Sequence, residues 1–164
     1  MLQISTKPPK RAVLVIFNKI NLNILPFFDI EEKNAIQQRL NDGVKIIPYS
    51  KQQKTYFLFP LEIDLTTKED NIHEKLRIQG NTIYKMCKEY KEAELSLEVL
   101  GDFGKEYIAS ILAGINLSDY EFLKYRTKPK GYSLTVYVDP LLVDEAVINE
   151  LNLIADSVRI TKDL

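Results

Sequence analysis

The chain has 164 residues and a formal net charge of −1, because 22 Lys and Arg stand against 23 Asp and Glu. This length suits one domain with its own core, and the near-neutral charge excludes a molecule drawn as a whole onto polyphosphates or anionic membranes. The one Cys and the one His exclude a disulfide framework, a thiolate zinc site and a His-based metal cluster. We therefore predict a globular domain with no evident active site of its own.

The N-terminus has no signal-peptide pattern, because residues 1–11 are polar and contain Pro8 and Pro9. The longest apolar run, 12–17, is far shorter than the ~20 residues that span a bilayer. We expect no membrane segment and, by default, a cytoplasmic location.

The first strand and the first helix have clear signals. Residues 12–17 are continuously apolar and β-branched, which is typical of a strand buried on both faces. Asp29 and Glu32 have the spacing of a capping box, and 41–43 supplies a stop. The pattern predicts a helix over 30–41.

Two strand-like runs, 44–49 and 55–61, flank a polar segment and predict a hairpin. Proline cannot donate to a strand ladder, so Pro48 and Pro60 place these strands at an edge or at a bulge.

The polar cluster 66–71 predicts the start of a second helix, and Gly80 weakens its middle by about 1 kcal/mol relative to Ala. Its apolar stripe has helical period and consists of Ile72, Leu76, Ile83, Met86, Cys87 and Tyr90.

The second half predicts a half-exposed strand over 94–100, a helix after Gly104 and another strand over 133–138. Asp139 and Pro140 predict the opening of the last helix. The apolar stripe of that helix is Val143, Val147, Leu151, Ile154 and Val158.

This order of elements predicts one α/β domain with a mixed, mostly parallel sheet flanked by helices. The last stripe runs to Leu164 without a capping residue, whereas a natural helix end is usually capped or frayed. We therefore expect the 164 residues to be a piece of a longer protein.

Two C-terminal segments carry a family resemblance. Residues 120–128 have the order Tyr-x-Phe-x-x-Tyr followed by alternating basic residues, and 151–164 end in Lys162-Asp163-Leu164. Both resemble the leucyl (cytosol) aminopeptidase family just before its catalytic domain. Upstream of Tyr120 only the order and spacing of strands and helices agree.

The resemblance implies a non-catalytic N-terminal domain with a macro-domain-like three-layer sandwich, cut from a two-metal exopeptidase. The parent would be a hexameric hydrolase that removes N-terminal residues from peptides. Its zinc or manganese ions would lie in the absent catalytic domain, so no catalytic or metal residue is assigned to this chain. Residues 143–164 would begin the interdomain helix, with Val147, Leu151, Ile154, Val158, Lys162, Asp163 and Leu164 as its interdomain residues.

An aromatic and basic segment is a candidate interface or nucleic-acid contact. Its residues are Tyr120, Phe122, Lys124, Tyr125, Arg126, Lys128 and Lys130. The alternative is that the aromatic side chains anchor a helix end in the core while the cations complement the helix dipole.

Gly101 and Gly104 lie between a strand and a helix N-terminus, where backbone N–H groups can hold an anion. A macro-like module would bind a nucleotide or ADP-ribose near such a loop. The alternative is a capped turn, because Asp102 would repel a phosphate.

The lone His, the lone Cys and two pairs of carboxylates are expected to have structural roles and no catalytic role. His73 is expected at the surface and Cys87 in the core as a small apolar residue. The carboxylate pairs are expected on solvated faces rather than as acid/base dyads; they are Glu62 with Asp64, and Glu92 with Glu94.

Overall fold

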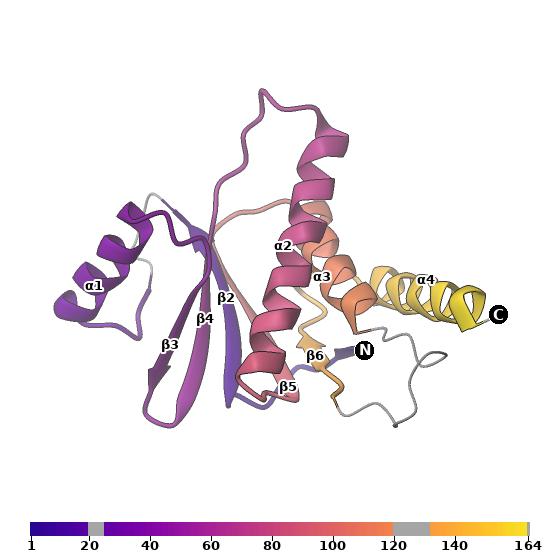
Figure 1. Ribbon diagram of the computed structural model, residues 1–164, viewed down its shortest axis with the longest axis horizontal. Helices are drawn as coiled ribbons and strands as arrows, with labels where there is room; N and C mark the ends of the chain where they lie inside the picture. The colour runs from indigo at the N-terminus through magenta and orange to yellow at the C-terminus, as the bar shows by residue number, and fades with distance from the viewer. Residues whose placement is uncertain (20–24, 120–131, 164) are drawn as a thin grey trace.

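The computed structural model describes residues 1–19, 25–119 and 132–163. Within them, six strands form one sheet in the order β1-β6-β5-β2-β4-β3. Neighbouring strands are parallel except for the antiparallel pair β3 and β4. Helix α1 covers one face and α2 and α3 cover the other (Figure 1). The predicted class, a mixed and mostly parallel sheet flanked by helices, is confirmed.

The described elements follow the chain in this order: β1 (Leu2–Ile4), β2 (Ala12–Asn18), α1 (Ile30–Asn41), β3 (Ile47–Lys51), β4 (Lys54–Leu61), α2 (Glu69–Glu89), β5 (Glu94–Leu100), α3 (Lys105–Ser118), β6 (Thr135–Val138) and α4 (Glu145–Asp163).

Strand β2 is the middle of the core, as its sequence predicts. It pairs with β4 on one side and β5 on the other, and residues 12–17 are all buried. Even-numbered Leu14 and Ile16 pack toward α2 and α3, while Val15 and Phe17 pack toward α1. Alternate side chains of a strand point to opposite faces, so one apolar run serves two cores.

Helix α1 has the predicted bounds and the predicted capping box. The Asp29 carboxylate accepts from Glu32 N at 2.8 Å, and the Glu32 carboxylate accepts from Asp29 N at 3.1 Å. Glu32 also accepts from Lys51 Nζ at 2.6 Å. The capping residue therefore also ties α1 to the end of the edge strand β3.

This contact makes stability depend on pH in the acid range. The hydrogen bond from Lys51, followed by that from Asp29 N, lowers the pKa of Glu32 from 4.5 to about 2. A carboxylate whose pKa is lower in the folded than in the unfolded state stabilises the fold at pH values above its unfolded-state pKa. The contribution of Glu32 is therefore lost as the pH falls toward 2. We expect the free energy of unfolding to fall over that interval, and to fall less steeply in Glu32→Gln. Urea unfolding at several pH values measures this.

The control for this pH series is Glu31→Gln, because Glu31 is an exposed carboxylate in the same helical turn. Equal pH slopes for Glu32→Gln and the parent would contradict the expectation.

The predicted hairpin is present as β3 and β4, with different bounds: 44–46 precede β3, and Ser50, Lys51 and Lys54 of the expected polar linker lie in the strands. Its turn places Gln52 and Gln53 at φ 50° and 64°, as a two-residue turn with two left-handed positions requires. Pro48 lies in edge strand β3, and Pro60 lies beyond Leu58, where the pairing of β4 with β3 ends. Both prolines therefore stand where a missing N–H is tolerated.

Helices α2 and α3 approach each other at two glycines. A Cβ at Gly80 would overlap the Ile111 carbonyl oxygen and lie 2.9 Å from Ile115 N. A Cβ at Gly114 would overlap the Arg77 carbonyl oxygen. The sequence identifies Gly80 as a weak point of its helix, whereas the structure makes it a contact point between two helices.

The two ends of the chain differ from the predicted elements. The N-terminal residues form β1, a strand outside those predicted, and it pairs with β6 from the other end of the chain. The last helix begins at Glu145, because the Asp139 carboxylate accepts from Leu141 N at 2.9 Å and holds a turn. Val147 N and Ile148 N then bond to Asp144 O, at 3.0 and 3.1 Å.

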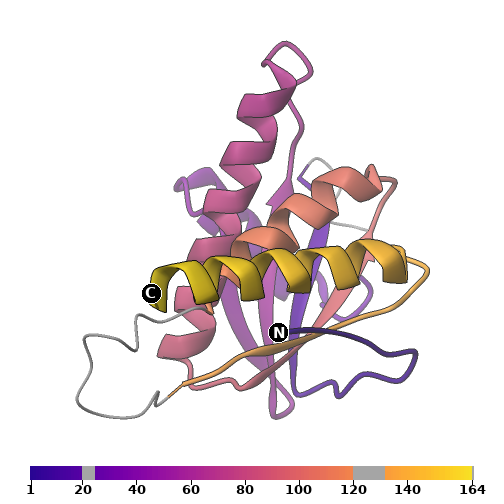
Figure 2. The ribbon, with the colours of Figure 1, turned by 90° about the vertical axis from the view of Figure 1, so that its right-hand side faces the viewer.

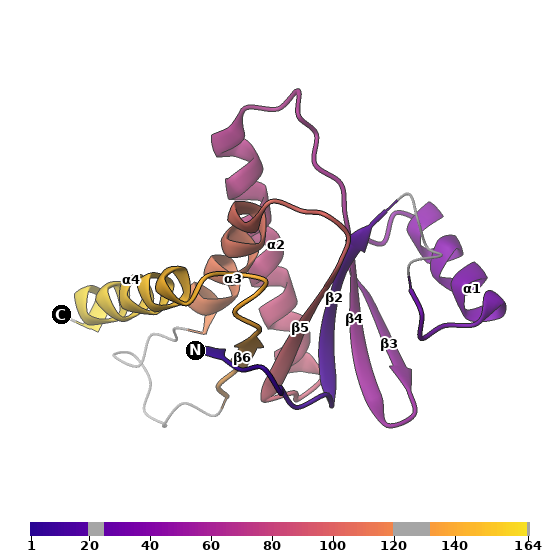
Figure 3. The same ribbon diagram turned by 180° about the vertical axis from the view of Figure 1, so that it is seen from behind.

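Helix α4 lies at the opposite end of the molecule from α1, and it crosses in front of α3 when viewed from its own side (Figures 2 and 3). It contacts α3 and β1. In the described part of the chain, no helix is both long and apolar enough to cross a membrane.

Candidate functional site

A pocket among the described residues lies at the carboxyl ends of β2 and β4. The connection after β2 leads to α1 on one face of the sheet, and the connection after β4 leads to α2 on the other face. Adjacent parallel strands whose connections part in this way leave a crevice between them, which is the usual ligand position in open α/β sheets. The topology therefore places a hollow at this point.

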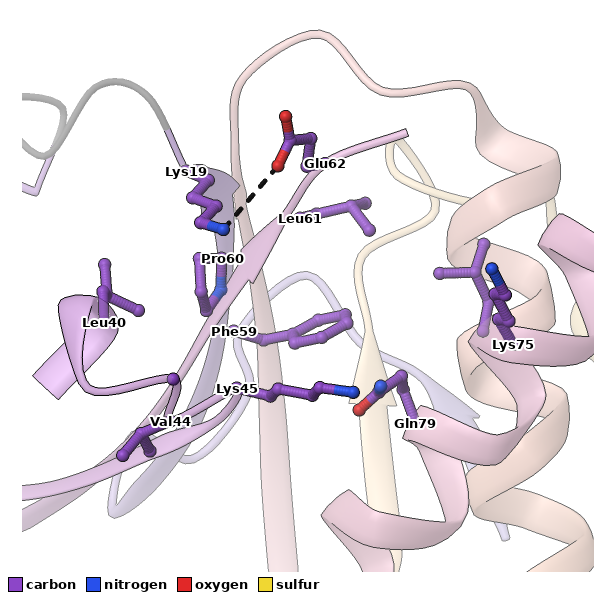
Figure 4. Close-up of a pocket in the computed structure, with 12 residues that line it drawn as sticks. Lys19, Leu40, Val44, Lys45, Phe59, Pro60, Leu61, Glu62, Lys75 and Gln79 are labelled. Carbon is purple, nitrogen blue, oxygen red and sulfur yellow. Dashed lines mark ion pairs between the residues drawn. The ribbon is translucent and has the colours of Figure 1, made fainter. Parts of the chain in front are cut away.

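The pocket has a volume of about 380 Å³. Figure 4 shows the side chains that line it. Its floor contains Phe59, Pro60 and Leu61 from β4, and α2 supplies Leu76 and Gln79. The other lining residues are Lys19, Leu40, Gly43, Val44, Lys45, Glu62 and Lys75.

The charge of the lining is positive, with three lysines and one glutamate. Lys19 Nζ lies 3.7 Å from a Glu62 carboxylate oxygen, and both side chains are largely exposed. Among the described residues, neither Lys45 nor Lys75 forms an ion pair. The lysines therefore outnumber the one carboxylate of the lining, and Lys75 also interacts electrostatically with Asp64 outside the lining.

The predicted interdomain residues on α4 divide between two sides. Val147 and Leu151 are half-buried and pack against the core below α3, and Val158 is half-buried. Ile154 is 45 % exposed. Nothing in the structure tests a partner for this helix, and the side chains of 162–164 lie outside the described residues.

An asparagine that the sequence does not single out docks α4. The Asn152 side chain accepts from Leu2 N at 3.1 Å and donates to Leu2 O at 2.9 Å. It also accepts from Asn116 Nδ2 at 3.1 Å. One amide therefore joins α4, α3 and the free edge of β1, where backbone groups would otherwise lack partners.

The aromatic and basic segment lies outside the described residues. This holds for Tyr120, Phe122, Lys124, Tyr125, Arg126, Lys128 and Lys130. Its role in an interface or in nucleic-acid binding stays a prediction.

The glycine loop before α3 holds a carboxylate of the chain itself. Gly101 has a φ of 134°, and Gly104 is the N-cap residue of α3. A Cβ at Gly104 would lie 2.5 Å from a Glu106 carboxylate oxygen, so that carboxylate lies against the helix start. It complements the helix dipole there. Anion binding at Gly101 and Gly104 stays a prediction.

The lone histidine lies between α2 and α3 and is only partly exposed, contrary to the expected surface position. Its Nδ1 lies 2.6 Å from Ser110 Oγ, and its ring stacks on Tyr107 with centroids 5.4 Å apart. Ser110 is 8 % exposed and bonds back to Glu106 O within its own helix. Through this contact the buried Ser110 hydroxyl joins α3 to α2, and His73 Nε2 lies 3.7 Å from a Glu69 carboxylate oxygen.

The lone cysteine is buried, as predicted. Burial raises the pKa of the Cys87 thiol to about 12. Because the thiolate is the reactive form, we expect a disulfide reagent to modify the native chain at least about a hundredfold more slowly than the chain in denaturant. Absorbance of the released thiolate measures both rates, and equal rates would contradict a buried thiol.

One expected surface carboxylate is buried. Glu92 is 9 % exposed, and it accepts from Thr55 Oγ1 at 3.1 Å. Arg11 Nε lies 3.8 Å away. These partners come from the start of β4 and the residue before β2, so only the assembled sheet brings them to Glu92.

In the part of the chain that the structure describes, no group of three or more His, Cys, Asp or Glu could hold a metal ion.

The comparisons with known proteins point to a fold. No protein-family model and no curated protein matches this sequence. Among solved structures, the chain is similar to a variant of tomato leucine aminopeptidase, with a TM-score of 0.60 and 11 % identity. The match covers 97 % of this chain and 36 % of the tomato chain. The class defined here is thus an α/β sandwich whose fold is shared with part of an aminopeptidase.

Proposed function

We propose that this chain is the non-catalytic N-terminal domain of a leucyl-aminopeptidase-like metalloexopeptidase. The observation that carries the proposal is the coverage of the structural match, nearly all of this chain against about a third of the tomato enzyme. A match of that form is expected when one domain of a larger enzyme is compared with the whole. The zinc or manganese ions and the peptide site would belong to the catalytic domain.

In this proposal α4 connects the two domains and fixes their relative position. Leu153 and Ile160, seven residues apart, share one side of α4 and are 66 % and 64 % exposed. Apolar side chains in such an exposed row are typical of a contact surface. The catalytic domain would cover this row, and the domain would support a homo-oligomer from the outside.

The test is the reading frame beyond Leu164. We expect it to continue into a domain with the Lys, Asp and Glu metal ligands of the family, and the longer protein to hydrolyse leucine amides when zinc or manganese is added. The 164-residue chain alone is expected to be inactive. A stop directly after Leu164, or a continuation without those ligands, would overturn the proposal.

A further inference from the structure

We propose that the pocket at the carboxyl ends of β2 and β4 binds a small organic anion, in which a phosphate or carboxylate group is attached to a compact apolar body. This site is separate from the proposed peptidase role and does not depend on it. The charge, the apolar floor, the size and the position of the pocket support this assignment.

The charge comes from two separate elements. Lys75 lies on α2, and Lys45 lies in the connection between α1 and β3. Figure 4 shows Lys45 and Gln79 pointing toward one another across the hollow. Lysine cations on two elements around one hollow attract an anion, and this attraction is strengthened beside a low-dielectric wall.

The floor beneath these cations is apolar. Phe59, Leu61 and Leu76 are 4 %, 3 % and 5 % exposed, and Leu40 and Val44 line the side toward α1. Pro60 adds no N–H donor to this surface. A bare inorganic ion would leave the floor unused, whereas a ring or short alkyl group would cover it.

The size limits the ligand. A volume of about 380 Å³ is near the lower end of the range of roughly 300–1,000 Å³ that small-molecule pockets occupy. One ring with one anionic group fits such a space. Lys19 lies at the rim with Glu62, so this ion pair can exchange its partners when an anion enters.

The experiment uses the isotope-labelled 164-residue chain and amide chemical shifts. It is titrated separately with phenyl phosphate, benzoate, phenol and inorganic phosphate. We expect saturable shifts at the amides of the pocket with phenyl phosphate or benzoate, and the tighter of the two identifies the anionic group. Phenol and inorganic phosphate are expected to bind at least about tenfold more weakly.

The variants test whether the two lysines carry the binding. Lys45→Gln with Lys75→Gln is expected to weaken the better ligand about tenfold or more, while the shift dispersion of the folded chain is retained. Lys85→Gln is the matched control, because Lys85 is an exposed lysine on the same helix outside the pocket. Equal loss in this control would mean diffuse attraction to positive charge and would overturn the proposal. Amide shifts that do not saturate with either organic anion would also overturn the proposal. The same holds if phenol binds as tightly as phenyl phosphate.

Discussion

Gly80→Ala and Gly114→Ala are each expected to lower the free energy of unfolding by about 2 kcal/mol, although Ala favours an isolated helix by about 1 kcal/mol over Gly. The added methyl group at Gly80 would meet the backbone of α3, and the one at Gly114 would meet the backbone of α2. A flexible side chain could turn aside, but a helix backbone moves only if the two helices separate. The sign of the change therefore distinguishes helix propensity from helix packing.

Chemical denaturation of the two variants measures the effect. Asn81→Ala is the control, because Asn81 neighbours Gly80 on α2 and is exposed. It is expected to leave stability unchanged or to raise it slightly. A stabilised Gly80→Ala variant would show that α2 and α3 lie farther apart than in the structure.

Asn152→Ala is expected to lower the free energy of unfolding by about 2–3 kcal/mol. The substitution removes the partners of Leu2 N and Leu2 O, and leaves the Asn116 amide with Leu151 O as its remaining acceptor. Partly buried backbone groups that lose their partners are expensive, because water reaches them poorly. The loss should fall mainly on β1 and α4, since these are the elements that Asn152 joins.

Hydrogen exchange at the Leu2 amide gives the local readout, and it should become faster in Asn152→Ala than in the parent. Asn149→Ala is the matched control on the exposed side of the same helix. If exchange at Leu2 is unchanged while overall stability falls, Asn152 acts through α4 alone and the bridge to β1 is not formed.

The same bridge links the fold to the proposed function. If α4 leads into a catalytic domain, Asn152 sets the direction in which it leaves the sheet. Asn152→Ala would then loosen the domain arrangement of the longer protein, whereas the anion pocket, which contains neither β1 nor α4, would keep its affinity. The two proposals can therefore fail independently.

Local patterns determined most of the elements of this protein. The apolar run of β2 and the capping box of α1 each act over a few residues, so the sequence predicts them directly. The polar segment between two strand-like runs predicts the hairpin, but not its two-residue turn at Gln52 and Gln53. The fold class follows because the order of these elements leaves few ways to cover both faces of a sheet. The burial of Cys87 follows in the same way from its place on an apolar helical stripe.

The tertiary structure alone decided the features that join distant parts of the chain. The pairing of β1 with β6, the burial of Glu92, the contact of Gly80 with α3 and the bridge through Asn152 each depend on residues far apart in sequence. The lysine-lined pocket arises because two strand ends meet and their connections part. A sequence pattern reports which face of an element is apolar, but the neighbour that comes to lie against that face is set by packing.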